Sequence, residues 1–370
     1  MKITNVTAYH LPGTRYPWVF LRVDTDEGIH GWGQASSGPH SDVVAAAASR
    51  LGPILIGQDP TRIEYIWHKL YASFNSLGSL GFVSALISGI DIALWDIRGK
   101  MLGLPIYELL GGKFHDNLIL YSNGWFEGCE TPEVRARGPT RRWTRATPRS
   151  SSTRSSGAPP TSRGTLPTTR RTRTTPPWTS SRRFAPRSAT TSRSSSTRMA
   201  ASTCRPPCAS PTDCAHRIGW FEEPVPPENW DALKQFRDQT DVPICVGERL
   251  YTRWQFRPVL EQKLADYIMP DIIRTGGISE MKKIATLAET FFVPISPHDA
   301  TGPITLIAGA QTMMSTSSFF RLEIAYSELR KYQQIMDPPF DVHDGYFHVS
   351  DAPGLGHEPR ADYLEQGIPY

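Results

Sequence analysis

The most restrictive feature of this 370-residue chain is a repeat in its second half. Five short apolar runs each lead into an acidic or basic residue and then into a helical pattern; these residues are Glu222, Glu248, Asp271, His298 and Glu323. Successive members are roughly 25 residues apart, the length of one strand–helix unit. Such units predict a parallel sheet, and at this chain length closure into a barrel is the usual outcome. The catalytic face of such barrels lies at the C-terminal strand ends, so we expect the five side chains to converge.

Residues 1–115 have a different, α+β pattern. Val19, Leu21 and Val23 alternate before a turn at 24–28, which predicts a β-hairpin with 29–32. Apolar residues then recur at three- and four-residue steps from 86 to 101, which predicts a long helix. A glycine pair at 111–112 follows the helical region and indicates a domain boundary.

Residues 141–210 have a composition unlike the rest of the chain. They hold 15 Arg and no Lys, Asp or Glu, and most of the segment is Ser, Thr, Arg, Pro or Ala. The rest of the chain holds 25 basic and 36 acidic residues, so the net charge of +4 describes neither part. A segment of this composition, about 135–213, cannot bury enough apolar area to offset chain entropy. As written, we expect it not to fold.

Two interpretations of this segment remain open. A basic nucleic-acid-binding tail is one, but the segment lacks Tyr and Lys and interrupts a fold instead of ending one. The other, which we favour, is translation of a GC-rich gene out of frame. In the shifted frame, 191–204 can encode Asp-x-His-Gly and 147–156 can encode a Lys-containing strand. That Asp would fall at the junction of Ser196 and Thr197, one barrel period before Glu222.

The residue types at the strand ends predict metal-assisted proton transfer. Glu222 and Glu248, with a third carboxylate from the preceding strand, would offer hard oxygen ligands that suit Mg²⁺. Asp271 beside His298 would fix the imidazole tautomer and raise its basicity. Glu323, if protonated, could donate a hydrogen bond to a substrate carboxylate. The alternatives are structural: a helix-capping Glu222 or Glu223, a satisfied core histidine, and a rim carboxylate.

Several motifs resemble the mandelate racemase subgroup of the enolase superfamily, and within it the acid-sugar dehydratases of the galactonate type. In the second half these are 218–224 (IGWFEEP), 246–249 (VGER), 270–277 (PDIIRTGG) and 297–299 (PHD). In the first half they are 24–33 (DTDEGIHGWG), 57–60 (GQDP) and 89–100 (GIDIALWDIRGK). The resemblance covers the whole chain except the odd segment.

The resemblance implies an α/β fold of two parts. These are an α+β capping domain over 1–115, with a C-terminal return over about 340–370, and a modified (β/α)7β barrel of the TIM type over 116–339. It implies Glu222 and Glu248 as Mg²⁺ ligands, Asp271 and His298 as a catalytic dyad, and Glu323 as donor to the substrate carboxylate. The family's third-strand Asp ligand, the His near it and the second-strand Lys are absent from the written sequence.

The function that we expect is dehydration of a sugar acid, an aldonate or aldarate. Removal of the C2 proton would give an enediolate stabilised by Mg²⁺, and loss of the C3 hydroxyl would give a 2-keto-3-deoxy acid. Substrate choice would lie in cap loops over 11–18 and 74–82, where Arg15 and Tyr16 are candidate contacts. The alternatives are a racemase, epimerase or cycloisomerase with the same chemistry, or an inactive pseudoenzyme if the segment over 135–213 is real.

Composition sets the remaining expectations. No run of 18 apolar residues occurs and the N-terminus lacks an apolar leader, so we expect a cytoplasmic protein that binds no membrane. We expect no nucleic-acid partner, a small-molecule substrate and a homo-oligomer.

Overall fold

The computed structural model describes residues 1–13, 16–36, 38–74, 76, 78, 80–123, 198–200 and 219–370. For 198–200 it describes the backbone alone. Arg15 and most of the segment over 135–213 lie outside these residues.

The capping domain is built on an antiparallel sheet of order β14-β1-β2-β3. Its strands are β1 (Ile3–Leu11), β2 (Trp18–Thr25), β3 (His30–Gln34) and, from the end of the chain, β14 (Ile368–Pro369). The predicted hairpin is confirmed: β2 pairs with β3 across a turn in which Gly28 has φ 77°. The C-terminus thus completes a sheet that the N-terminus begins.

Helices cover this sheet, and the longest confirms the helical prediction. They are η1 (Gly38–His40), α1 (Ser41–Ala48), α2 (Gly52–Leu55), α3 (Ile63–Ser73), α4 (Phe82–Leu102) and α5 (Ile106–Leu109). α4 packs directly on β3, because a Cβ at Gly33 would lie 1.8 Å from the Gly89 carbonyl oxygen. It ends where Gly103 turns left-handed, at φ 67°.

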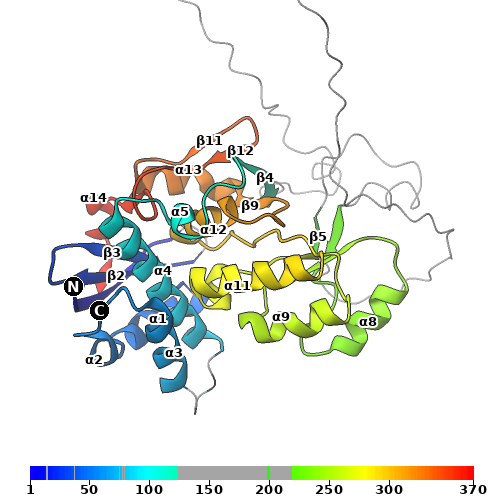
Figure 1. Cartoon of the computed structure of the whole chain (residues 1–370), viewed down its shortest axis with the longest axis horizontal. Coiled ribbons are helices and arrows are strands. Elements are labelled where there is room, and N and C mark those ends of the chain that lie inside the picture. The colour runs from blue at the N-terminus through cyan, green and yellow to red at the C-terminus, as the bar shows by residue number, and fades with distance from the viewer. Residues whose placement is uncertain are drawn as a thin grey trace, which may run out of the picture. The chain divides into compact units, whose positions relative to one another are not determined.

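The second half forms successive strand–helix units, as the repeat predicts (Figure 1). The strands are β4 (Leu118–Asn123), β6 (Trp220–Glu222), β7 (Ile244–Val246), β8 (Tyr267–Ile268) and β9 (Leu322–Ala325). The helices are α8 (Trp230–Asp238), α9 (Thr252–Glu261), α10 (Ile272–Thr275), α11 (Gly277–Thr290), α12 (Pro303–Met314) and α13 (Tyr326–Ile335).

These strands run parallel around an arc. β6, β7 and β8 pair in order, and single parallel bridges continue from Ile268 to Ile295 and from Ile295 to Phe319. β9 then pairs in parallel with β4, the first strand of this domain. The arc brings the ends of β4, β6, β7, β8 and β9 to one face, as a barrel requires.

Two local details differ from a regular barrel. β5 (Arg198–Ala200) runs antiparallel to β6, with Arg198 opposite Glu222, where a parallel strand is expected. The written sequence has no apolar run there to build that parallel strand. In addition, Glu323 lies within β9 instead of after it, because that strand begins only at Leu322.

The C-terminal segment, 336–370, contacts both domains. It contains β10 (Met336–Asp337), β11 (Asp341–His343), β12 (Tyr346–His348), β13 (Glu358–Pro359), α14 (Ala361–Leu364) and β14. β12 pairs with β4 of the barrel, and β14 pairs with β1 of the cap. These pairings support the predicted C-terminal return, although the exact domain boundaries stay predictions. In the described residues no helix combines the length and apolar character needed to cross a membrane.

Candidate active site

Asp271 and His298 form a hydrogen-bonded pair at neighbouring strand ends. Asp271 caps the N-terminus of α10, where its Oδ1 accepts a hydrogen bond of 2.9 Å from the Ile273 amide. Its Oδ2 lies 2.8 Å from His298 Nδ1. One carboxylate oxygen is therefore fixed by the backbone while the other orients the imidazole. The pair has the geometry that the sequence predicted.

The opposite nitrogen of this imidazole faces two more carboxylates. His298 Nε2 lies 3.2 Å from Glu248 Oε2 and 3.9 Å from Glu323 Oε2. Burial lowers the pKa of His298, but Glu323, Asp271 and Glu248 together raise it to about 10. Four of the five predicted residues thus meet around one ring.

Glu222 is the inward-facing member of its acidic pair. It is buried at the end of β6, and Trp220 Nε1 donates a hydrogen bond of 3.2 Å to its Oε2. Burial, followed by repulsion from Glu323 and Glu248, raises its pKa to about 7. The charge of Glu222 is therefore coupled to the same carboxylates that surround His298.

Neither glutamate caps the following helix, because Asn229 is the N-cap of α8; Glu223 instead contacts the loop after β7. Its Oε1 accepts a hydrogen bond of 2.6 Å from the Gly247 amide, and its Oε2 lies 2.6 Å from Arg249 Nη2. These contacts connect the end of β6 to the loop that carries Glu248. They also leave Glu223 turned away from the carboxylate cluster.

Glu323 is held by a residue that sequence reasoning missed. Asn123, at the end of β4, donates a hydrogen bond of 2.7 Å to Glu323 Oε1. Glu323 is fully buried, its Oε2 has no hydrogen-bond partner in the described part of the chain, and burial raises its pKa. This shift is in the direction of the protonated acid that a substrate-carboxylate donor requires, whereas the charge of His298 and the hydrogen bond from Asn123 oppose it. The apolar run 118–121 places Asn123 near the end of a strand, but nothing in the sequence indicates that it would contact Glu323.

Tyr121 and Asp299 were also missed. The Tyr121 hydroxyl and both Asp299 carboxylate oxygens are buried without a hydrogen-bond partner among the described residues. Burial, followed by the neighbouring carboxylates, raises the pKa of each group. Asp299 follows His298 directly and was part of a recognised motif, but no pattern in the sequence indicates that its oxygens would be unpaired.

The cap contacts the loop that follows His298. Gln34, at the end of β3, donates a hydrogen bond of 3.1 Å to the Thr301 carbonyl and accepts one of 3.2 Å from the Ile304 amide. Tyr16, in the β1–β2 loop, is 40% exposed. Its proposed substrate contact stays a prediction, and Arg15 lies outside the described residues.

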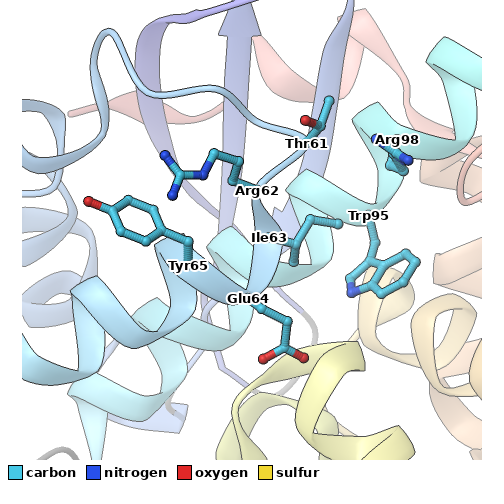
Figure 2. A pocket seen from close by; sticks show the side chains of 7 residues that line it. All are labelled: Thr61, Arg62, Ile63, Glu64, Tyr65, Trp95 and Arg98. Atoms are coloured by element: carbon cyan, nitrogen blue, oxygen red, sulfur yellow. The ribbon is translucent and has the colours of Figure 1, made fainter.

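A shallow hollow on the cap is separate from these residues. It is lined by Thr61, Arg62, Ile63, Glu64, Tyr65, Trp95 and Arg98 (Figure 2). In it Arg62 lies over the Tyr65 ring at 4.0 Å, and none of the predicted catalytic residues takes part.

Comparison with known proteins agrees with this fold. Residues 7–111 match the mandelate racemase/muconate lactonizing enzyme N-terminal domain, and 211–363 match the enolase C-terminal domain-like family. A D-galactonate dehydratase of Cronobacter sakazakii is 33% identical, with 97% of this chain and 92% of the relative covered. A D-xylonate dehydratase of Haloferax volcanii is 30% identical, and the alignment covers 98% of this chain and 88% of the relative.

A solved structure described as a putative dehydratase from Mesorhizobium loti superposes with a TM-score of 0.73. It is 27% identical, and the superposition covers 99% of this chain and 98% of that one.

The structure combines a capping domain with a barrel whose strand ends carry clustered acids and a histidine. These features define the class of protein. The chain belongs to the enolase superfamily, in its mandelate racemase/muconate lactonizing enzyme group. Within that group its relatives include dehydratases at about a third identity, and it is an enzyme of the hydro-lyase class.

Proposed function

We propose that this protein is a Mg²⁺-dependent dehydratase of a sugar acid, an aldonate or aldarate, that forms a 2-keto-3-deoxy acid. The observation that carries the proposal is the placement of His298 between Asp271 and the carboxylates of Glu248 and Glu323. The relatives named D-galactonate and D-xylonate dehydratase support the substrate class.

Glu222 and Glu248 suit a divalent cation. Their mutual repulsion helps to raise the pKa of Glu222, and a cation between them would remove that repulsion. Both are carboxylates at neighbouring strand ends, the oxygen donors that Mg²⁺ prefers. When bound, the ion would lower the energy of negative charge that develops on the substrate carboxylate.

The protein groups would then divide the remaining work. Protonated Glu323, fixed by Asn123, would donate a hydrogen bond to the substrate carboxylate. His298, fixed by Asp271, would be one member of the acid–base pair that moves protons at C2 and at the departing C3 hydroxyl. The other member and the third metal ligand would come from the segment that we interpret as out of frame.

The test is a comparison of the written chain with a frame-restored chain. Each is incubated with a panel of aldonates and aldarates in the presence of Mg²⁺, and 2-keto-3-deoxy acid is measured. We expect product from the restored chain, and none after chelation of the metal. Absence of turnover with every substrate in the restored chain would overturn the proposal. Solvent deuterium at C2 without loss of water would instead identify a racemase or epimerase.

A further inference from the structure

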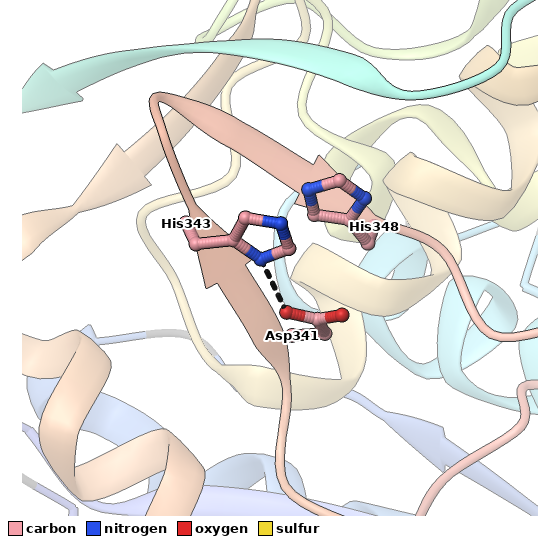
Figure 3. Close-up of side chains that lie close together, drawn as sticks. All are labelled: Asp341, His343 and His348. Carbon is pink, nitrogen blue, oxygen red and sulfur yellow. Dashed lines mark hydrogen bonds and ion pairs between the residues drawn. The ribbon is translucent and has the colours of Figure 1, made fainter. Parts of the chain in front are cut away.

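A second cluster of potential metal ligands lies on the hairpin formed by β11 and β12, outside the proposed active site. Asp341 pairs directly with His348 across the two strands, and His343 is two residues from Asp341 on the same strand. The three side chains therefore share one face of the hairpin. One ligand atom from each lies within 4.8 Å of the other two (Figure 3).

The three side chains contact one another, and one ring nitrogen among them has no partner among the described residues. His343 Nδ1 lies 2.7 Å from Asp341 Oδ1, and the rings of His343 and His348 stack with centroids 3.8 Å apart. His348 Nε2 is buried and has no hydrogen-bond partner among the residues that the structure describes. A buried polar atom without a partner is uncommon and calls for a ligand or water.

We propose that this hairpin binds a divalent transition-metal ion of the Zn²⁺ type. The ligands are one imidazole nitrogen each from His343 and His348 and a carboxylate oxygen of Asp341. Imidazole ligands favour Zn²⁺, Co²⁺, Ni²⁺ and Cu²⁺, whereas the all-carboxylate donors of Glu222 and Glu248 favour Mg²⁺. The two sites therefore differ in the ions that they select.

Binding requires a small local rearrangement. Metal–ligand bonds of about 2.0–2.2 Å bring the three donor atoms closer together than they are now. The Asp341 and His343 side chains are 64% and 56% exposed, so they can rotate without disturbing a core. The ring stack is lost in the process, and water completes the coordination.

The position of the site suggests its effect on the fold. β11 is the edge strand of the sheet β11-β12-β4-β9, and β4 carries Asn123. A metal bound to both strands of the hairpin secures that edge. It stabilises the folded state increasingly as its concentration rises above Kd, as any ligand specific for the native state does.

The experiment uses the full chain, which is first stripped of bound metal. It is then kept in excess Mg²⁺, which occupies the carboxylate site so that this site does not compete for Zn²⁺. Zn²⁺ binding is followed by calorimetry, and Co²⁺ binding by its visible absorption. The test variant is the double substitution His343→Ala/His348→Ala. The control is His40→Ala/His68→Ala, which removes two exposed histidines elsewhere. A third variant, Asp341→Asn, keeps both imidazoles.

We expect the control to bind like the unmodified chain and Asp341→Asn to bind about 10–100-fold more weakly. The double variant should lose the Co²⁺ spectrum of a nitrogen-ligated ion and the rise of Tm with Zn²⁺. An unchanged Kd in the double variant, or no Zn²⁺ binding by the unmodified chain, would overturn the proposal. Histidine NMR signals provide a second measurement, since those of His343 and His348 should shift on addition of Zn²⁺.

Discussion

At the scale of single residues, Asp271 performs two tasks with its two carboxylate oxygens. Oδ1 caps α10, while Oδ2 holds the imidazole of His298. Asparagine can still accept the amide hydrogen bond but carries no charge. We therefore expect Asp271→Asn to leave the fold intact and to lower the pKa of His298 by at least about one unit, because an anionic neighbour is lost.

This change is measured by NMR titration of the His298 ring in metal-free protein. The unmodified chain should hold its imidazolium form well above neutral pH, because the pKa of His298 is raised to about 10. The variant should lose the proton at lower pH. An unchanged titration in Asp271→Asn would contradict the role assigned to this carboxylate.

Glu222 and Glu223 form a matched pair of neighbouring residues. Glu222 is buried and coupled to Glu248 and Glu323, whereas Glu223 is bound to Arg249. We expect Glu222→Gln to weaken Mg²⁺ binding at least about tenfold and Glu223→Gln to weaken it much less, since only the first loses a proposed ligand. Calorimetric titration of Mg²⁺ into each variant checks this. Equal losses would contradict the assignment of Glu222 as a ligand.

At the scale of elements, the cap helices are hydrogen-bonded to the junction of α10 and α11, one short helix after Asp271. Trp67 of α3 donates a hydrogen bond of 2.8 Å to the Gly276 carbonyl, and Ser88 of α4 accepts one of 3.0 Å from the Gly276 amide. Asp91 accepts hydrogen bonds from the amide and hydroxyl of Ser279 at the start of α11. The cap therefore supports the dyad as well as covering the barrel.

This close packing leaves no room for a side chain at Gly277. It has φ 87°, and a Cβ there would lie 2.4 Å from Asp91 Oδ2. Gly28 has a similar φ of 77° but open space around it. We expect Gly28→Ala to cost about 1–2 kcal/mol of unfolding free energy through backbone strain alone. Gly277→Ala should cost about 1–3 kcal/mol more, because of the overlap. Urea unfolding of both variants measures the difference, and equal losses would contradict the packing argument.

Most of the helices and strands could be predicted from the sequence, because the patterns that indicate them are local. The regular period of the strand–helix units located β6 to β9 and their polar ends. Asn123 and the unpaired oxygens of Asp299 were not predictable, because their environments depend on residues far away in the chain. The antiparallel β5 was not predictable either, since the written sequence there has no strand pattern.

At the scale of the whole molecule, Glu358 holds the C-terminal segment to the capping domain. Its carboxylate lies 3.3 Å from His30 Nε2 and 2.6 Å from Lys100 Nζ. Hydrogen bonds from His30 and Lys100 lower the pKa of Glu358 to about 2, below the value of 4.5 for a free side chain. The stabilisation is therefore complete above about pH 4.5 and is lost as the pH falls towards 2.

We expect Glu358→Gln to lower the free energy of unfolding at pH 7 and to have progressively less effect below about pH 4.5. Urea unfolding at several pH values measures this difference. Glu365→Gln, which changes an exposed carboxylate near the C-terminus, is the control and should have no effect at any pH. A difference that persists unchanged at about pH 3 would contradict the linkage.

The segment between the two family matches differs in composition from the rest of the chain. The two family matches leave 112–210 unmatched, although the alignment with the Cronobacter sakazakii relative covers 97% of the chain. The relative therefore has a segment of similar length at this position. The written sequence of the segment, in contrast, matches neither family. We expect nucleotide sequencing across codons 130–214 to reveal two compensating frame changes.

The restored frame should supply a third carboxylate before β6, next to Glu222. Because two carboxylates hold Mg²⁺ more weakly than three, the written chain should bind it at least about tenfold more weakly than the restored chain. Intact-mass measurement of the natural protein gives an independent check. A single uninterrupted frame, together with a mass of 41.3 kDa as written, would show that the segment is real. Such a chain would keep the dyad of Asp271 and His298 without a complete metal site, which is the arrangement of a pseudoenzyme.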